Sequence, residues 1–397
     1  MKKVVLAFSG GLDTTYCAVH LNRDLGYEVH GVTVNTGGFS GQESATLEEI
    51  AQNLGLKSYR MIDASKKYYE EAIRYLIFGN VLKNNTYPLS VSAERIIQAI
   101  AIAGYANELG ADAIAHGSTG AGNDQVRFDM TFHTICPDME IITPIRDQSL
   151  TRNQEIAYLT SHSIEGDWSK SAYSINQGLW GTSIGGKETL TSAKSLPEEA
   201  YLHQCENQVP SQVTLTFKNG EPVGIDGRSI TPVQVIQALN ELTNQYAIGR
   251  DMHVGDTVIG IKGRVGFEAG GALVTIKAHH LLEKHVCSKQ QLFIKDQLAA
   301  WYGQMMHDGQ MLDPVMRDIE AFFASAQAHV SGDVYIKLLP YRFELEGISS
   351  KYDLMGDKVS MYGEETSGWS AQEARGFSKI LANQTKIYQK VKQQDED

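Results

Sequence analysis

Several features that would take this 397-residue sequence out of the class of ordinary globular proteins are missing from it. The four cysteines, Cys17, Cys136, Cys205 and Cys287, show no CxxC spacing, which excludes a zinc ribbon and argues against a disulfide framework. No apolar run approaches the roughly 20 residues of a membrane span. There is also no internal repeat and no low-complexity segment. We therefore expect reduced, buried cysteines and no membrane partner.

Positive charge is also scarce, because 35 Lys and Arg residues face 47 Asp and Glu residues and leave a formal net charge of −12. A nucleic acid would have to bind against the field of the whole molecule, so we expect no nucleic-acid partner. The start Met1-Lys-Lys leads into five apolar residues, which are too few for the apolar region of a signal peptide, and no small-residue cleavage site follows. We expect a cytoplasmic protein.

The chain nevertheless has the composition of a folded protein, with 42% hydrophobic and 21% charged residues. Its length predicts two or three domains. In the first third, short apolar runs at 4–8, 29–34, 59–62 and 113–115 alternate with helical patterns. This order predicts an α/β domain with a doubly wound, mostly parallel sheet, whose ligands lie outside the carboxyl ends of the strands.

Local signals predict where the helices of this domain begin and end. Thr46 and Glu49 have the spacing of a capping box, and Gly55 is placed for the end of the same helix. Ser92 is the expected start of a second helix that stops at Gly110.

After about residue 165 the pattern becomes antiparallel. Asn219-Gly220 between two apolar runs predicts a two-residue hairpin, and Thr231-Pro232 predicts the start of a helix. We therefore expect an α+β domain after the α/β domain, with domains at 1–165, 166–365 and 366–397.

The last segment is expected to be a helix. Ser370 and Glu373 form a capping box, and an apolar stripe follows at spacings of three, four, seven and three residues: Ala374, Phe377, Leu381, Tyr388 and Val391. Such a stripe needs a partner. The helix either lies back on its own domain or clasps another subunit, and we favour the second interpretation.

The first chemical motif is the octapeptide at 7–14, in which Ser9-Gly10-Gly11 joins a strand to a helix. Backbone N–H groups at the positive end of a helix form a cradle for an anion. Ser9 and Thr14 can add hydroxyl donors, and Asp13 can reach a magnesium ion that bridges phosphates. There is no GxxxxGK[ST] sequence, so this is not a Walker loop. Taken alone, Gly-Gly after a strand is often only a tight turn.

The whole octapeptide is more specific, and it resembles the pyrophosphate loop of the N-type ATP pyrophosphatases. These enzymes cleave ATP between its α and β phosphates to make adenylates. The resemblance implies that ATP and Mg²⁺ are needed, with Asp13 at the metal. It also implies that ATP is contacted by Ala7, Phe8, Ser9, Gly10, Gly11, Leu12, Asp13, Thr14, Thr15 and Val34.

The second motif is the glycine-rich loop at 116–128, which follows the strand expected at 113–115. Asp124 suits an ammonium group, Thr119 and Asn123 can donate to carboxylate or carbonyl oxygens, and Arg127 can hold an anionic or ureido oxygen. A solvated loop with a local Asp–Arg pair is the alternative, although few structural loops need the whole set.

This string, HGSTGAGNDQVRF, is similar to the aspartate-binding segment of the argininosuccinate synthase family. The resemblance covers nearly the whole chain in the order and spacing of its segments. It implies that aspartate is bound by Thr119, Asn123 and Asp124, that citrulline is bound by Asn123 and Arg127, and that Gly117 lies against ATP.

Further segments resemble the citrulline-binding elements of that family. Tyr87, Ser92 and Arg95 match the YxxxxSxxR pattern. The segment 173–183 matches a second element, which implies that Ser174 and Ser183 contact citrulline. Glu268 matches a citrulline-binding glutamate. This sequence departs from the family pattern at four positions: Asn176, Gln177 and Gly178 stand where the pattern has Asp, Glu and Asn, and Leu282 stands where it has a tyrosine.

Two clusters are expected to be structural. The histidines in His279-His280-Leu-Leu-Glu283-Lys-His285 do not have the spacing of a common zinc site. Tyr68, Tyr69 and Tyr75 are expected to pack a helix rather than to stack a base.

The resemblance implies a ligase, forming a homotetramer through its C-terminal helix, that joins citrulline to aspartate through a citrullyl-adenylate. No protein nucleophile is required, and catalysis would rest on positioning by Asp13, Asp124, Arg95 and Arg127. A tRNA-thiolating relative would require a basic face and paired cysteines. A silent nucleotide-binding regulator would tolerate the loss of Asp13, Asp124 and Arg127, all of which are present.

Overall fold

The computed structural model describes residues 1–39, 41–166, 168, 173–356 and 368–393. Two compact units are present, Met1–Ser350 and Lys351–Asp397, and each is described by itself. The domain boundary predicted between residues 365 and 366 falls outside the described residues.

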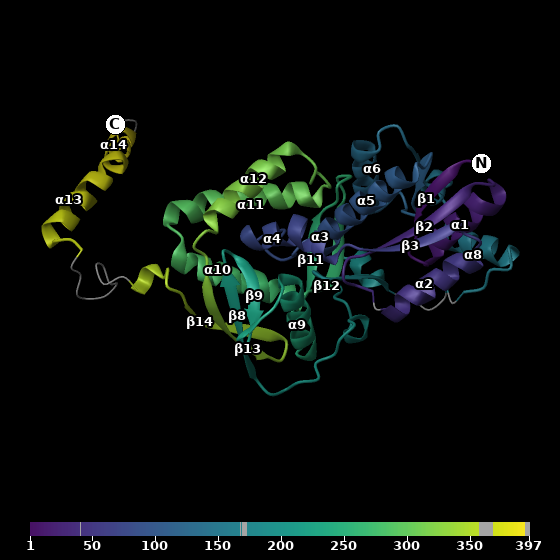
Figure 1. Cartoon of the computed structure of the whole chain (residues 1–397). Coiled ribbons are helices and arrows are strands. Elements are labelled where there is room, and N and C mark those ends of the chain that lie inside the picture. Colours follow the sequence, from purple (N-terminus) through teal and green to yellow (C-terminus); the bar gives the residue numbers. More distant parts are fainter. Residues whose placement is uncertain (40, 167, 169–172, 357–367, 394–397) are drawn as a thin grey trace. The chain divides into compact units, whose positions relative to one another are not determined.

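The first unit begins with a five-stranded parallel sheet (Figure 1). Its strand order is β3-β2-β1-β4-β5, so the direction in which strands are added reverses between β1 and β4. All four predicted strands are confirmed within two residues. The strands are β1 (Lys3–Ala7), β2 (Glu28–Asn35), β3 (Ser58–Asp63), β4 (Ala113–Ala115) and β5 (Glu140–Ile142).

Helices cover both faces of this sheet, as the alternation of side chains along β1 requires. Val5 packs in the core cluster that contains Ala93 and Ile97 of α5, whereas Val4 and Leu6 pack in a second cluster with the residues of α1. The helices of this region are α1 (Leu12–Val19), α2 (Gly41–Asn53), α3 (Ser65–Tyr68), α4 (Arg74–Phe78), α5 (Ser90–Leu109), α6 (Asp124–Ile135), α7 (Pro144–Asp147) and α8 (Arg152–Ser161). The predicted α/β domain is confirmed.

Both predicted helix ends are confirmed, but both predicted starts are wrong. Gly55 and Gly110 have positive φ angles of 81° and 61°, the left-handed conformation that ends many helices. Thr46 is not a cap, because α2 begins at Gly41 and the Thr46 hydroxyl donates to the carbonyl of Gln42 inside the helix. Helix α5 begins two residues before Ser92, after a fully buried Leu89 with φ of 62°.

Antiparallel sheets follow, as expected. One has the order β10-β9-β8-β13-β14 and the other β11-β12-β7-β6. Asn219 and Gly220 have φ angles of 49° and 79° in the predicted hairpin, and Thr231 caps α9 as predicted. The strands are β6 (Ser174–Gly178), β7 (Gly181–Gly185), β8 (Ser211–Lys218), β9 (Glu221–Ile225), β10 (Arg228–Ser229), β11 (Arg250–Asp256), β12 (Lys262–Glu268), β13 (Gly332–Leu339) and β14 (Arg342–Ser349).

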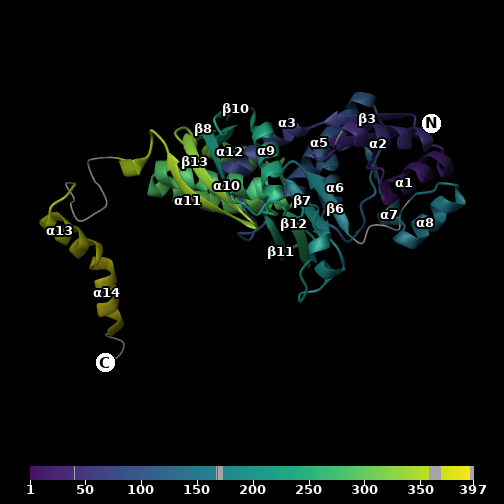
Figure 2. The ribbon, with the colours of Figure 1, turned by 90° about the horizontal axis from the view of Figure 1, so that it is seen from below.

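Four more α-helices lie in the described part of the first unit, and Figure 2 shows them beside these sheets. Buried His279 bonds to Asn80 and Gln327, and Tyr68 donates to the carbonyl of Ser90, so both side chains have the structural roles expected of them. The helices are α9 (Pro232–Gln245), α10 (Gly270–Val286), α11 (Lys289–His307) and α12 (Pro314–Ala326).

The second unit contains α13 (Ala371–Leu381) and α14 (Asn383–Lys392) in place of one continuous helix. The predicted cap is confirmed, because the Ser370 hydroxyl accepts from the N–H of Glu373 while the Glu373 carboxylate accepts from Ser370. No residue of either helix is buried, and the predicted stripe is exposed, Phe377 by 66% and Tyr388 by 67%.

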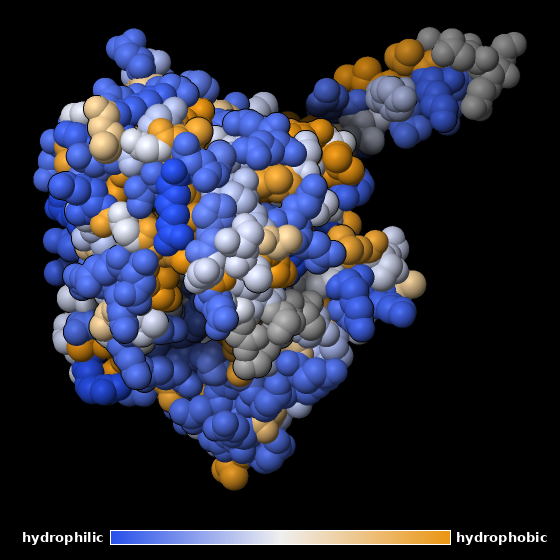
Figure 3. Space-filling model, turned by 90° about the vertical axis from the view of Figure 1, so that its right-hand side faces the viewer, coloured by the Kyte–Doolittle hydropathy of each residue, from blue (hydrophilic) through white to orange (hydrophobic). Residues whose placement is uncertain are grey.

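The surface seen in Figure 3 is mostly hydrophilic, with apolar residues scattered over it. Among the helices that the structure describes, none combines the length and the apolar character needed to cross a membrane.

Candidate active site

The loop after β1 forms a compact turn at the start of α1. Gly10 has φ of 71°, and a Cβ atom there would lie 2.5 Å from Cδ2 of Leu47, so glycine is needed both for conformation and for space. The hydroxyls of Ser9 and Thr14 lie 3.2 Å apart across the turn. The hydroxyls therefore lie beside the first turn of α1, whose N–H groups have no carbonyl partner within the helix, as an anion site requires.

The second predicted loop reaches the same place from the end of β4. A Cβ atom on Gly117 would lie 3.1 Å from Cβ of Asp13 and 3.3 Å from the backbone N of Thr14. Glycine thus allows the two motifs to touch at the point where the strand order of the parallel sheet reverses, which is where such sheets bind ligands.

Asp124, the first residue of α6, is bridged by two arginines. Its Oδ2 accepts from Nε of Arg95 at 3.0 Å, and its Oδ1 accepts from a terminal nitrogen of Arg127 at 3.1 Å. Burial alone would raise the pKa of Asp124, but the two guanidinium groups outweigh it and lower that pKa below its usual value. Asp124 is therefore a carboxylate throughout the neutral range.

Both arginines are held by further contacts. Arg127 donates to the hydroxyl of Ser92 at 2.9 Å and to the carbonyl of His307. Arg95 donates to Gln98 and to the side-chain oxygen of Asn176. An amide at position 176 therefore still accepts from Arg95, although the family pattern has a carboxylate there. These contacts fix the guanidinium groups before any substrate arrives.

Asp13 has a second carboxyl group as its neighbour. Burial, together with the charge of Asp13 and a hydrogen bond to it, raises the pKa of Glu155 in α8 to about 8. Glu155 is 3% exposed, and its Oε2 has no hydrogen-bond partner among the described residues. The pair thus holds a proton at neutral pH.

A cavity of about 1020 Å³ is lined by both loops, by Asp124 and by its two arginines, and we call it the active-site cavity. Most of the predicted site residues line it. The exceptions are Gly10, Thr15 and Glu268; Thr15 is buried and donates to the carbonyl of Gly10. The predicted residues that line the cavity are Ala7, Phe8, Ser9, Gly11, Leu12, Asp13, Thr14, Val34, Tyr87, Ser92, Arg95, Gly117, Thr119, Asn123, Asp124, Arg127, Ser174 and Ser183.

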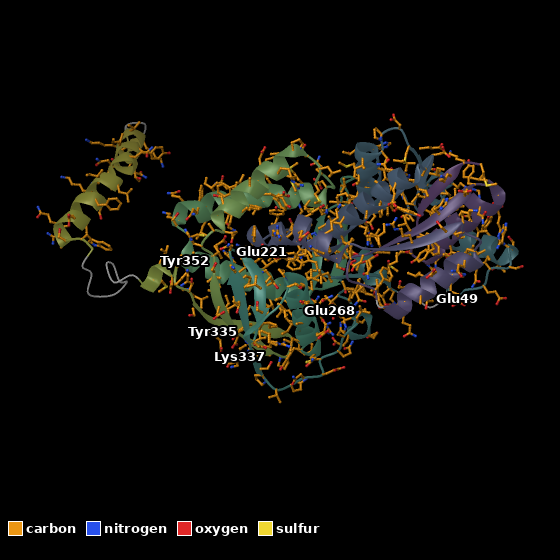
Figure 4. The ribbon with its side chains drawn as sticks, viewed as in Figure 1. Glu49, Glu221, Glu268, Tyr335, Lys337 and Tyr352 are labelled. Atoms are coloured by element: carbon orange, nitrogen blue, oxygen red, sulfur yellow. The ribbon has the colours of Figure 1, made fainter. Side chains whose placement is uncertain are left out.

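Glu268 lies apart from the other predicted site residues. It pairs with Thr182 in the β12–β7 ladder, whereas Ser183 pairs with Phe267 and Asn176. Because successive side chains of a strand point to opposite faces, Glu268 and Ser183 lie on different faces of this sheet. Glu268, labelled in Figure 4, is 4% exposed and contacts Nδ1 of His203. It therefore does not line the active-site cavity, and Leu282 belongs to a hydrophobic core.

Glu94 and His253 are among the residues of the cavity wall that the sequence patterns missed. Glu94 lies beside Arg95 on α5, and its Oε1 accepts from the hydroxyl of Thr36 at 2.6 Å. A Cβ atom on Gly178 would lie 2.9 Å from Glu94 Oε2, so the glycine leaves room for this carboxylate. His253 on β11 also lines the cavity. The sequence signal for His253 was the alternation of residues along β11. This signal places the side chain only once the pairing register of β11 with β12 is known.

Comparisons with known proteins agree with the motifs. Residues 3–165 match the family model described as the arginosuccinate synthase N-terminal HUP domain, and residues 173–388 match the arginosuccinate synthase C-terminal domain. The chain is 36% identical over 392 residues to a protein named argininosuccinate synthase from Dictyoglomus thermophilum, covering 98% of this chain and 97% of that one. A protein of the same name from Methanocaldococcus jannaschii is 35% identical, with 97% of each chain covered.

Proposed function

Since this chain belongs to the argininosuccinate synthase family, we propose a role in the reaction of that family for each group of side chains that meets in the active-site cavity. The enzyme is a ligase of arginine biosynthesis that joins citrulline to aspartate with ATP through citrullyl-AMP, releasing AMP and pyrophosphate. The observation that carries the proposed roles is the contact between the loop at 9–14 and the loop at 116–124 inside one cavity.

In the first half-reaction the ureido oxygen of citrulline attacks the α-phosphorus of ATP, and pyrophosphate leaves. The N–H groups and hydroxyls of the loop at 9–14 absorb the negative charge that develops on the leaving group. Arg95 and Arg127, which Asp124 holds in place, orient the ureido group. No side chain needs to act as a nucleophile.

Mg²⁺ is part of the proposal. Asp13 lines the cavity beside the hydroxyls of Ser9 and Thr14, and these oxygen donors suit a small hard cation. When bound, Mg²⁺ would neutralise charge on the phosphates. The proton that Glu155 holds beside Asp13 keeps the net charge of the two carboxyl groups low until the metal and the nucleotide bind.

In the second half-reaction the amine of aspartate attacks the activated ureido carbon, and AMP leaves. Asp124 is proposed to hold the ammonium group of the incoming aspartate, because it is a carboxylate at neutral pH and lies beside Asn123 at the start of α6. Asn123 and Thr119 would donate to the aspartate carboxylates. The oxygen of the Asn123 amide already accepts from the N–H of Val258, which leaves its NH₂ group for a substrate.

We further propose that the enzyme acts in the cytoplasm as a homotetramer held by α13 and α14. The support is the exposed apolar stripe of these two helices, which a neighbouring subunit would cover.

One assay tests the function directly. ATP breakdown to AMP and pyrophosphate is measured with citrulline, with aspartate, with both and with neither. We expect net formation of AMP and argininosuccinate only when both amino acids are present. Net formation of AMP in the absence of citrulline or of aspartate would contradict the assignment.

A further inference from the structure

The loop at 9–14, which is proposed to hold the leaving pyrophosphate, contains no basic residue. As the bond from the α-phosphorus of ATP breaks, the bridging oxygen keeps the electron pair, so pyrophosphate leaves with more negative charge than it had within ATP. The N–H groups and hydroxyls of the loop carry no net charge, and its ionisable residue is the acid Asp13. Sites of phosphoryl transfer commonly place a cation at such a leaving group. A cation beside this loop would therefore assist the first half-reaction.

Among the described residues, four arginines line the active-site cavity. Arg95 and Arg127 are bonded to Asp124, at the start of α6. Arg264 lies on β12 and donates from its two terminal nitrogens to backbone carbonyls. The fourth is Arg152, which is the first residue of α8. It has no role in the proposed reaction so far.

Arg152 lies on the side of the cavity that the loop at 9–14 occupies. Helix α8 packs against α1, the helix that begins in this loop (Figures 1 and 2). Arg152 and Glu155 are three residues apart on α8 and therefore share a face of that helix. The charge of Arg152 acts on the carboxyl group of Glu155, and Glu155 is hydrogen-bonded to Asp13. One helical turn thus separates Arg152 from a residue that contacts the loop.

The guanidinium group of Arg152 is available to a ligand. Among the described residues, its hydrogen-bond partner is the backbone carbonyl of Trp168, which is a neutral group. The residue is exposed as well as lining the cavity. A guanidinium group has five N–H donors in a planar fork that fits two oxygens of a phosphate. A bond to one carbonyl therefore leaves most of these donors, and the whole charge, for an anion.

We infer that Arg152 binds the pyrophosphate end of ATP and stabilises the negative charge that develops there as the bond to the α-phosphorus breaks. The inference rests on the proposed function, because it adds a catalytic residue to the first half-reaction. Arg152 supplies from α8 the positive charge that the loop at 9–14 lacks.

Binding of magnesium pyrophosphate to the resting enzyme tests this contact without turnover. Titration calorimetry should give a Kd for Arg152→Met that is roughly 10- to 150-fold above that of the wild type, because a hydrogen bond to a charged group contributes about 1.5–3 kcal/mol. Methionine keeps an unbranched side chain but removes the charge. Arg152→Lys keeps the charge but loses the planar fork, so its Kd should lie between the other two.

Turnover gives a second readout, and a matched variant controls for the loss of one surface charge. In Arg152→Met, kcat for argininosuccinate formation should fall, whereas KM for citrulline and KM for aspartate should stay within about 2-fold of the wild type. Arg23 is also exposed and also donates to a backbone carbonyl, at His162 after the end of α8, but it does not line the cavity. Arg23→Met should match the wild type in both measurements.

Two failures are distinguishable. A wild type that makes no argininosuccinate from citrulline and aspartate would refute the proposed function itself. A wild type that does so, while Arg152→Met binds pyrophosphate as tightly as the wild type, would overturn the role of Arg152 alone. Equal weakening of pyrophosphate binding in Arg23→Met would also overturn that role, because the effect would then come from net charge and not from this contact.

Discussion

Asp124 holds two arginines that come from different segments of the chain, Arg95 from α5 and Arg127 from its own helix. The same carboxylate is proposed to receive the ammonium group of aspartate. Removal of the charge of Asp124 should therefore weaken both the placement of the arginines and the binding of aspartate. These two effects appear in different half-reactions.

We expect Asp124→Asn to retain a measurable first half-reaction and to lose most product formation. The amide can still accept one hydrogen bond from an arginine, but it cannot offer a charge to aspartate, and a charge-assisted bond is worth about 1.5–3 kcal/mol. Citrulline-dependent exchange of pyrophosphate into ATP reports the first half, and argininosuccinate formation reports the whole reaction. Asp138→Asn, at an exposed acid outside the cavity, is the control. An unchanged KM for aspartate would remove Asp124 from the proposed site.

Glu155 gives a pH dependence of stability whose sign can be worked out. Its pKa is about 8 in the folded protein against an ordinary value of 4.5 for a glutamate, so the folded state binds a proton that the unfolded state has already lost. The stabilisation is complete below pH 4.5 and is lost as the pH rises towards 8, at about 1.4 kcal/mol for each unit of pKa difference.

The free energy of unfolding of Glu155→Gln should therefore fall less between pH 5 and about 8 than that of the wild type. Chemical denaturation at several pH values measures it, without Mg²⁺ or nucleotide. Glu49→Gln, at an exposed acid labelled in Figure 4, should follow the wild type. Parallel curves for Glu155→Gln and the wild type would show that Glu155 titrates normally.

Among the elements, α5 and the β8–β9 hairpin use glycine for opposite reasons. Gly104 lies on the exposed side of α5, where an added Cβ atom would meet nothing within 4 Å. Gly220 lies in the hairpin turn with φ of 79°, and a Cβ atom there would lie 2.6 Å from the side-chain oxygen of Gln327. Gly104 lowers the stability of its helix, whereas Gly220 is required by the backbone conformation of its turn.

Alanine at the two positions should change stability in opposite directions. Gly104→Ala should stabilise the protein by about 0.5–1 kcal/mol, because glycine inside a helix costs conformational entropy. Gly220→Ala should destabilise it by at least about 1 kcal/mol, because of its positive φ and the clash with Gln327. Urea unfolding of both variants decides the matter. A stable Gly220→Ala protein would mean that the turn can change its type.

In the whole molecule, the clearest unexplained surface is the stripe on α13 and α14, where Phe377, Ile380, Leu381, Ile387, Tyr388 and Val391 are all more than half exposed. Such a stripe is stable in water only if something covers it.

Removal of residues 369–397 should lower the oligomeric state, as measured by light scattering. Phe377→Ser with Leu381→Ser in the full chain should have the same effect, and Gln384→Ser, which changes a polar residue nearby, should not. If the truncated protein folds and keeps the mass of the full-length assembly, the helices do not join the subunits.

The sequence predicted elements and loops well wherever the signal was local. The parallel strands, the hairpin at Asn219 and the caps at Thr231 and Ser370 each follow from neighbouring residues. Predictions failed where distant contacts decided the outcome. Buried Leu89 adopts a left-handed conformation because the core holds its side chain, so α5 starts before Ser92. The face on which Glu268 lies could not be read from the sequence, because one step of strand register moves a side chain to the other face.

The alternation of the β11-β12-β7-β6 sheet also has a use in protein engineering. His253 and Ser183 face the cavity, while Thr182 and Glu268 face the segment around His203. A combinatorial library that randomises only the cavity-facing positions would explore new amino-acid substrates and leave the packing behind the sheet unchanged. In a saturation mutagenesis map, tolerance to substitution should therefore alternate along β7 with a period of two, and selection for a new substrate should favour changes at Ser183 over changes at Thr182.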